Sequence, residues 1–407
     1  MNKSMPGPSH TVKAARPPQA SQPFLEDIAS WENTKLGYKQ AMKGRKRHKR
    51  DAIRFERRQL TNLKNLQRAI LAEEYVPGPQ MHFIIHEKKT RVIDAPWIED
   101  KIPQNMIHEK LLPVFLLRWV KSTFACIPNR GNLQAAMKIQ RDMKLARLKW
   151  GEDCWIVKAD IHHCFPSISH EILIDILAGI LDDPRVVDLE RRIILASPPM
   201  EEPGRGLPLG NVTNQDHANL VLSKLDNYVV RFKGIRFYTR YMDDMVAIVQ
   251  TREEAQELLA GMCDYARKYL ELEFNGKSKI FPLKQGVTSL GFRIFPDHME
   301  VSQASIKAMK RRMKRLDEKL QAGEIDQERV QQTVESWLGY ARWGNNFHVA
   351  QQLFTPYPYI QVEKPGFKFG DPYQKKRLLA KWDGVTLPKK KPKPKKTKKN
   401  KKRRKTG

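Results

Sequence analysis

Apolar residues recur at helical spacing through the first part of the chain. The pattern begins near Phe24, breaks at the basic stretch Lys43–Arg50 and resumes through Leu71. The cluster Pro77-Gly78-Pro79 then ends it, because proline lacks a backbone N–H and glycine favours turns. The N-terminal part is therefore predicted to be helical, with one basic interruption.

Further along the chain, the apolar period alternates between that of a strand and that of a helix. Alternating apolar residues in "MHFIIHEKKTRVIDAP" predict a hairpin, and "DCWIVKADI" predicts a buried strand. The segments "IRFYTRY", "MVAIVQ" and "SLGFRIF" predict three more strands. Helices are predicted over residues 100–148, 170–195, 213–231, 252–271, 302–322 and 326–342. Helices before, between and after the strands favour an α+β fold.

The charge balance narrows the class of partner. The formal net charge is +29, and residues 389–405 contribute thirteen lysines or arginines and no acid. Subtracting these thirteen charges leaves +16 on the rest of the chain, so the folded part is itself basic. A polyanion is the expected partner, and nucleic acid is the commonest one. Residues 1–22, rich in Pro, Ser, Gln and Ala, and the Lys-rich tail 385–407 are expected to be disordered.

Cysteine spacing and hydropathy exclude several other classes. The four cysteines form neither a C-x-x-C pair nor a finger spacing, which argues against a structural zinc site and a disulfide framework. The longest apolar run is far shorter than a membrane span, and the N-terminus lacks the apolar core of a signal peptide. A cytoplasmic protein without a membrane partner is expected.

The strongest chemical signal is the segment Tyr241-Met242-Asp243-Asp244. It lies between two β-prone segments, so a strand–turn–strand would expose Asp243 and Asp244 at the tip of a hairpin. Adjacent carboxylates repel each other unless a cation neutralises them, and Mg²⁺ prefers carboxylate oxygens. Paired acids in a turn can also be ordinary solvated turn residues.

A second acid follows an apolar strand in "IVKADIHHCF". Asp160 ends this strand, and phosphoryl transfer with two metal ions needs carboxylates from separate strands. The alternative for Asp160 alone is a helix N-cap. Phe165 lies five residues further on, where a large ring could close the pocket against a ribose 2′-hydroxyl; the alternative is a core aromatic.

A third feature is the Gly-rich segment "RGLPLGNVTNQDHAN". Gly206, Pro208 and Gly210 allow the backbone to approach a ligand closely, and Asn211 to Gln215 then open a helix with polar side chains. An ordinary capped helix after a loop is the alternative.

Together these segments resemble motifs A, B and C of reverse transcriptases, in that order. "FNGKSKI" resembles motif D, and "SLGFRIF" resembles motif E. Upstream, "ENTKLGYKQAMKGRKR", "EEYVPGP", "KKTRVIDAPWIEDKIPQNMIHEKLLPVF" and "FACIPNRGNLQAAMKIQ" resemble the fingers of prokaryotic reverse transcriptases. The resemblance spans about residues 25–345. It implies an α+β right-hand polymerase with fingers, a palm of antiparallel sheet plus helices, and a helical thumb. The implied boundaries are 23–154 for the N-terminal helices and fingers, 155–297 for the palm and 298–384 for the thumb with a C-terminal extension.

The resemblance also implies site roles and partners. The chain would copy an RNA template into cDNA from a primer and dNTPs, with two Mg²⁺ ions that Mn²⁺ can replace. The implied catalytic residues are Asp160, Asp243 and Asp244, joined as metal ligands by Ile161. Implied dNTP contacts are Arg91, Lys101, Phe165, Gln215 and Lys277, the last as a proton donor to pyrophosphate. Leu209, Gly210 and Gln215 would face the template, and Leu290, Gly291 and Phe292 would form the primer grip.

A basic helical face follows motif E. Lys307, Lys310, Arg311, Lys314 and Arg315 recur at helical spacing. After motif E, this face suits a thumb helix that contacts the nucleic-acid backbone without regard to sequence. A solvated helix face is the alternative.

Motif B carries the subtype. Gln215 stands where group II intron enzymes have proline, and this is similar to the class of diversity-generating retroelements. That class implies an error-prone enzyme, mutagenic retrohoming and a small basic accessory protein that forms a ring. Asn214 departs from the serine usual in that class. A phage-defence enzyme with a dedicated non-coding RNA, or an inactive RNA-binding relative, are the alternatives. A prokaryotic or phage-encoded origin is expected.

Overall fold

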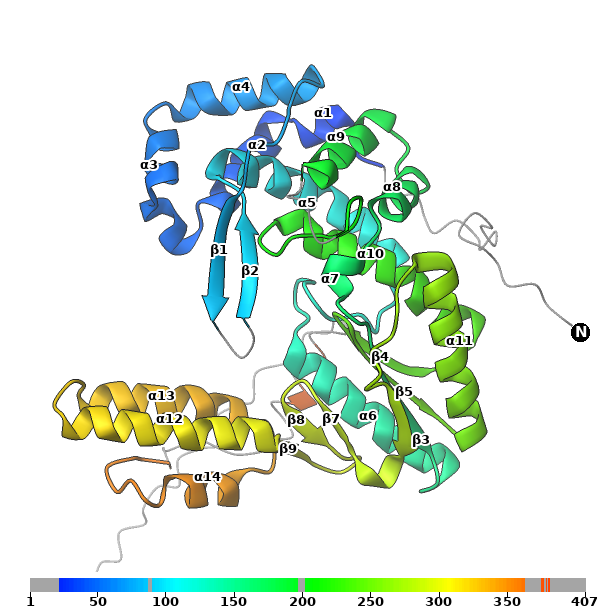
Figure 1. The fold of residues 1–407 in the computed structure, drawn as a ribbon, viewed down its shortest axis with the longest axis vertical. Helices are drawn as coiled ribbons and strands as arrows, with labels where there is room; N and C mark the ends of the chain where they lie inside the picture. The colour runs from blue at the N-terminus through cyan, green and yellow to red at the C-terminus, as the bar shows by residue number, and fades with distance from the viewer. Residues whose placement is uncertain are drawn as a thin grey trace, which may run out of the picture.

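The computed structural model describes residues 22–86, 90–196 and 202–362, together with residues 375, 376, 378 and 380. The predictions for residues 1–21 and 385–407 lie outside the described residues. Figure 1 shows three groups of elements: N-terminal helices with a hairpin, a central sheet with its covering helices, and a C-terminal group of helices. No helix in the described ranges is long and apolar enough to cross a membrane.

The N-terminal part is helical up to the proline cluster, as predicted. The Ser30 hydroxyl accepts a hydrogen bond from the Asn33 N–H at 3.4 Å and caps α2. The basic interruption is a 3₁₀ turn, and the hairpin follows the proline cluster. The elements are α1 Leu25–Ile28, α2 Trp31–Ala41, η1 Gly44–His48, α3 Arg50–Glu56, α4 Gln59–Leu71, β1 Met81–His86 and β2 Thr90–Ala95.

The helical region predicted over 100–148 contains two helices. It forms α5 Ile98–Arg118 and α6 Asn132–Trp150, with a loop between them. Pro128 cannot donate a helical hydrogen bond, and Asn129 has a positive φ of 62°. The loop between α5 and α6 runs beside strand β4 of the central sheet, with a β-bridge between Thr123 and Arg240.

The central sheet has the strand order β4-β5-β3-β6 and is antiparallel. Its strands are β3 Trp155–Asp160, β4 Phe237–Tyr241, β5 Asp244–Val249 and β6 Lys279–Pro282. Alternate residues point to opposite faces: Val157 and Ala159 pack in one apolar core with α10 and α11, while Ile156 packs in a second core with α6. Both faces are therefore buried, which fixes the register of the strands.

Between β3 and β4 the chain is mostly helical. The predicted helix over 170–195 is two helices, because Asp183 and Pro184 begin a new one: the Asp183 carboxylate accepts from the Arg185 N–H at 2.9 Å. The helices are α7 Cys164–Ser167, α8 His170–Ala178, α9 Pro184–Leu195, α10 Val212–Asn227 and, after β5, α11 Arg252–Leu270. A π-helical turn, Tyr228–Phe232, extends α10.

The segment "SLGFRIF" is two strands rather than the single strand predicted. Leu290 and Gly291 have φ values of 55° and 84°, so the chain reverses there. The resulting sheet has the order β7-β8-β9, with β7 Val287–Ser289, β8 Phe292–Ile294 and β9 Met299–Val301. Helices α12 Gln303–Gln321 and α13 Gln327–Ala341 follow as predicted, and α14 Phe347–Phe354 was not predicted.

Candidate active site

Strand pairing brings the three predicted acids to one end of the central sheet. Asp160, the last residue of β3, is the register partner of Asp244, the first residue of β5. Tyr241 pairs with Asp244 across the β4–β5 hairpin, so Met242 and Asp243 form its two-residue turn. The sequence predicted this hairpin, but only the β3–β5 pairing sets Asp160 beside it.

The loop that resembles motif D holds the main chain of Asp160. The Asn275 N–H donates to the Asp160 carbonyl oxygen at 2.7 Å, and the Asp160 N–H donates to Ser278 Oγ at 3.2 Å. Lys277 lies in the same loop with an exposed side chain. A further β-bridge joins Ile161 to Phe274. This loop therefore carries Lys277 next to the end of β3.

Electrostatic repulsion is built into the group of acids. Burial raises the pKa of Asp160, and the charges of Asp243 and Asp244 raise it further. Burial also raises the pKa of Asp244, although Lys158 and Ser289 partly oppose that rise. Lys158 Nζ lies 3.7 Å from Asp244 Oδ1, and the Ser289 hydroxyl donates to Asp244 Oδ2 at 2.7 Å.

The donor chemistry of this group fits a divalent cation. Asp160 and Asp243 are carboxylates whose mutual repulsion a bound cation would remove. Asp244 Oδ1 is buried and accepts no hydrogen bond. Within the described ranges no three His, Cys, Asp or Glu side chains converge as metal ligands, and Asp244 contacts Lys158 and Ser289. Asp160, Asp243 and Oδ1 of Asp244 are therefore the oxygen donors that could hold a divalent cation here.

The Gly-rich loop packs against the N-terminal hairpin. The Asp94 N–H donates to the Leu209 carbonyl oxygen at 3.0 Å. Gly210 has a φ of 137°, and a Cβ there would lie only 2.3 Å from the Asp94 carbonyl oxygen, so only glycine fits. The buried Asn214 amide donates to the Pro208 carbonyl oxygen at 2.9 Å and holds the loop from below. Asn214, which stands where the diversity-generating class usually has serine, therefore has a structural role in this loop.

The family assignment rests on a match over most of this region. A family model described as reverse transcriptase (RNA-dependent DNA polymerase) matches residues 79–294, more than half of the chain. The chain belongs to the reverse transcriptase family. This match confirms the predicted fold class, and such a domain indicates RNA-directed DNA polymerase activity.

Two curated proteins illustrate the relationship. An uncharacterized 91 kDa protein in a cob intron of Schizosaccharomyces pombe is 31% identical over 41% of this chain and 20% of its own length. A putative COX1/OXI3 intron 1 protein of Saccharomyces cerevisiae is 28% identical over 23% of this chain and 12% of its own length. The chain thus spans a fifth or less of the length of either. Among solved structures, telomerase from Candida albicans in complex with a telomeric RNA fragment matches with a TM-score of 0.44 and 12% identity, over 69% of this chain and 55% of that one.

The expectation of a cytoplasmic protein of prokaryotic or phage origin is wrong. The curated relatives that match are intron proteins of two yeasts, which are eukaryotes, and this contradicts that expectation.

Two other predicted site residues of the reverse transcriptase, Arg91 and Gln215, are exposed, as a ligand contact requires. Arg91 is exposed on β2 opposite Ile85, and Gln215 is exposed on the first turn of α10. Phe165 is half-buried in α7. Its ring packs against the apolar core on one side and remains partly accessible to solvent.

Several residues near these positions were not predicted from the sequence. Lys158 shares a face of β3 with Asp160, and its presence in an apolar strand was the available signal. Burial lowers the pKa of Lys101, and the positive charges of Lys49 and Lys46 lower it further, so the basic interruption lies close to Lys101. Ser289 gave no signal, because its contact with Asp244 joins segments 45 residues apart.

The predicted primer-grip residues adjoin the acids through a groove. A cavity of about 1040 Å³ is lined by Lys158, Asp244, Lys279, Leu290, Gly291 and Arg293, among others. The Tyr340 hydroxyl donates to the Leu290 carbonyl oxygen at 3.2 Å, and the buried Phe292 ring lies 4.4 Å from the Tyr340 ring. The predicted basic face of α12 is exposed: Lys307, Lys310, Arg311, Lys314 and Arg315.

Replacing Asp160 by asparagine is expected to stabilise the metal-free protein at pH 7. A carboxyl pKa raised above its ordinary value of about 3.9 means that the folded state holds a proton that the unfolded state has lost. The free energy of unfolding of the wild type therefore falls as pH rises through that window. Because Asp160 stays partly open to solvent, the gain in Asp160→Asn is about 1 kcal/mol or less. Urea unfolding between pH 4 and pH 8 measures it.

Added Mg²⁺ is the control for this prediction. It should stabilise the wild type more than the variant, because it relieves the same repulsion. A variant that is less stable than the wild type at every pH would show that Asp160 is not under electrostatic strain.

Proposed function

We propose that this chain copies an RNA template into cDNA by two-metal nucleotidyl transfer. The observation that carries the proposal is the placement of Asp160, Asp243 and Asp244 at one end of the central sheet, beside a groove that reaches the turn at Leu290 and Gly291. A primer strand lying in this groove would bring its 3′ end to the acids. Lys158, Lys279 and Arg293 line the groove and would neutralise the phosphates of the primer strand.

The proposed role of Asp160, Asp243 and Asp244 is to bind divalent metal ions. Reverse transcriptase domains use divalent metal ions. Two Mg²⁺ ions, or Mn²⁺ in their place, would lower the pKa of the primer 3′-hydroxyl and neutralise the triphosphate when bound. Asp160 and Asp243 would hold these ions, together with Asp244 and main-chain oxygen from Ile161.

The remaining residues would bind and orient the substrates. Arg91 and Lys101 would contact the triphosphate, with Lys46 and Lys49 adding positive potential beside Lys101. Lys277, carried next to Asp160 by the motif D loop, would give a proton to the leaving pyrophosphate. Phe165 would exclude a 2′-hydroxyl, while Leu209, Gly210 and Gln215 would face the templating base. Leu290, Gly291 and Phe292 would form the primer grip.

The basic face of α12 would hold the template–primer duplex. Its five cations are solvent-exposed and would contact phosphates without regard to sequence. The proposed division is 23–154 for the N-terminal helices and fingers, 155–297 for the palm and 298–384 for the thumb and extension.

Two biological roles are supported by different observations. The curated relatives are intron proteins, which favours a role on an intron RNA. Gln215, in place of the proline of group II intron enzymes, favours an error-prone enzyme of the diversity-generating type, which would work with a small basic accessory protein.

Primer extension followed by cDNA sequencing tests both levels. We expect incorporation of dNTPs on an RNA template that depends on a divalent cation. Errors concentrated at template adenines are expected for the diversity-generating role, whereas accurate copying of adenines favours the intron role. Absence of incorporation with Mg²⁺ and with Mn²⁺, while RNA binding is retained, would contradict the polymerase function and indicate an inactive RNA-binding relative.

A further inference from the structure

The turn that carries Asp243 has a strained backbone that one buried side chain holds. Met242 has a φ of 55°, in the left-handed region that residues with a Cβ seldom adopt. Such a conformation persists when surrounding contacts impose it. Arg240, on the β4 side of the turn, donates from Nη1 to the Met242 carbonyl oxygen at 2.9 Å. The guanidinium is completely buried, and the Met242 end of the contact is partly buried.

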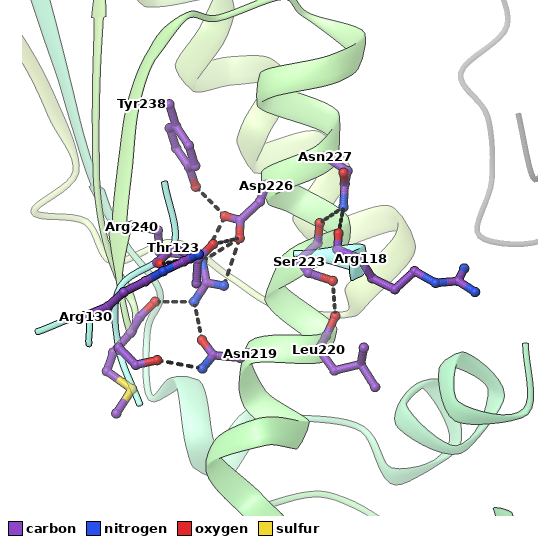
Figure 2. Close-up of polar contacts among 12 residues, drawn as sticks. Arg118, Thr123, Arg130, Asn219, Leu220, Ser223, Asp226, Asn227, Tyr238 and Arg240 are labelled. Atoms are coloured by element: carbon purple, nitrogen blue, oxygen red, sulfur yellow. Dashed lines mark hydrogen bonds and ion pairs between the residues drawn. The ribbon is translucent and has the colours of Figure 1, made fainter. Parts of the chain in front are cut away.

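The other end of this contact is fixed to helix α10. Arg240 Nε donates to Asp226 Oδ1 at 2.8 Å, and Nη2 donates to Asp226 Oδ2 at 2.8 Å. Nη1, which also holds Met242, donates to Asn219 Oδ1 at 3.0 Å. Figure 2 shows Arg240 lying between Asp226 and Asn219, both on α10. These two residues are seven positions apart and so lie on one face of the helix, two turns apart.

The network is closed on its remaining sides. Asp226 also accepts from the Tyr238 hydroxyl at 2.7 Å and from the Thr123 hydroxyl at 3.0 Å. The Arg240 N–H donates to the Ser122 carbonyl oxygen, and the Arg240 carbonyl oxygen accepts from the Phe124 N–H, each at 3.0 Å. The loop between α5 and α6 thus runs beside β4 and holds the main chain of Arg240 through these two hydrogen bonds.

Helix α10 connects this network to the Gly-rich loop. It begins at Val212, directly after the loop that contacts the N-terminal hairpin through Leu209 and Gly210, and it ends at Asn227. One rigid helix therefore contacts both the loop beside the fingers hairpin and the buried anchor of the Asp243 turn.

We propose that Arg240 is a positioning residue that ties helix α10 to the turn presenting Asp243, and so sets where this carboxylate meets the metal ions. The inference rests on the proposed polymerase function. Arg240 does not touch the reacting atoms; it acts through the Met242 carbonyl group. Lysine at this position would keep a charge for Asp226, but it lacks the planar fork that bonds Asp226, Asn219 and Met242 at once.

The test compares Arg240→Lys with Tyr238→Phe in the full-length chain. Tyr238→Phe removes one hydrogen bond to Asp226 and leaves the Met242 contact intact, so it controls for loss of stability. Two quantities are measured: kcat and KM for dNTP in primer extension, and Mn²⁺ affinity by electron paramagnetic resonance. We expect Arg240→Lys to lower kcat and Mn²⁺ affinity, each by about 10- to 100-fold, with KM unchanged within about threefold. Tyr238→Phe should change neither by more than about twofold.

The two readouts separate this inference from the polymerase function. A wild-type chain without incorporation would contradict the polymerase, yet a lower Mn²⁺ affinity in Arg240→Lys alone would still support the positioning role. Equal losses in the two variants, or an unchanged Mn²⁺ affinity in Arg240→Lys, would overturn it. Asn219→Ala serves if Arg240→Lys does not fold: it removes one acceptor of Nη1 but keeps the ion pair, and a several-fold lower Mn²⁺ affinity is expected.

Discussion

Replacing Asp243 by asparagine is expected to abolish primer extension while leaving the chain folded. Asp243 lies in the turn between β4 and β5, at the end of the sheet where β3 ends with Asp160, and its charge raises the pKa of Asp160. Loss of a single electrostatic stabiliser costs roughly 10²–10³ in kcat. A carboxylate that holds metal ions should cost at least that, so we expect a loss on the order of 10³-fold or more. Single-nucleotide incorporation with Mg²⁺ and with Mn²⁺ measures it.

The matched control is Asp264→Asn. Asp264 is a solvent-exposed acid on α11, 3.7 Å from Arg267, and it should affect incorporation by less than about twofold. Asp243→Asn itself should melt at the wild-type temperature or above it in the absence of metal, because it removes one of three mutually repelling charges. Incorporation within tenfold of the wild type would refute the assignment of Asp243.

Replacing Asp226 by alanine is expected to lower the free energy of unfolding by about 3–5 kcal/mol. Burial lowers the pKa of the Arg240 guanidinium, but Asp226 outweighs this and keeps it charged. Both side chains are completely buried, so removing the carboxylate leaves a charge without its partner and the Tyr238 and Thr123 hydroxyls without their acceptor. Since native proteins are stable by only about 5–15 kcal/mol, the loss is large. The midpoint of urea unfolding, followed by circular dichroism, measures it.

Asp188→Ala is the control for this loss. Asp188 forms ion pairs with Arg191 at 2.9 Å and with Arg192 at 3.0 Å on the surface of α9, and each such pair contributes about 0–1 kcal/mol. The double variant Arg240→Met with Asp226→Leu should recover part of the loss, because no charge is left unpaired. Equal losses in the free energy of unfolding for Asp226→Ala and Asp188→Ala would show that the buried Asp226–Arg240 pair stabilises the fold no more than a surface pair does.

The amino-acid sequence by itself determined the local parts of the site. The apolar runs in "IVKADI" and "RFYTRYMDDMVAIVQ" are typical of short strands buried on both faces, so β3, β4 and β5 were predictable together with the acids at their ends. The order of the motifs then indicated the family, which the match over residues 79–294 confirmed. The positive φ of Leu290 was not predictable in the same way, since leucine rarely adopts it.

Only the tertiary structure decided how these parts meet. Asp160 and Asp244 are 84 positions apart, and their pairing depends on strand register that two buried cores fix, not on either segment alone. The contacts of Ser289 with Asp244 and of Asp226 with Arg240 also join separate segments of the chain. A single serine or acid in a sequence forms no pattern from which its partner could be predicted. Local spacing therefore determines which side chains can do chemistry here, whereas packing decides which of them share a charge, a hydrogen bond or a turn.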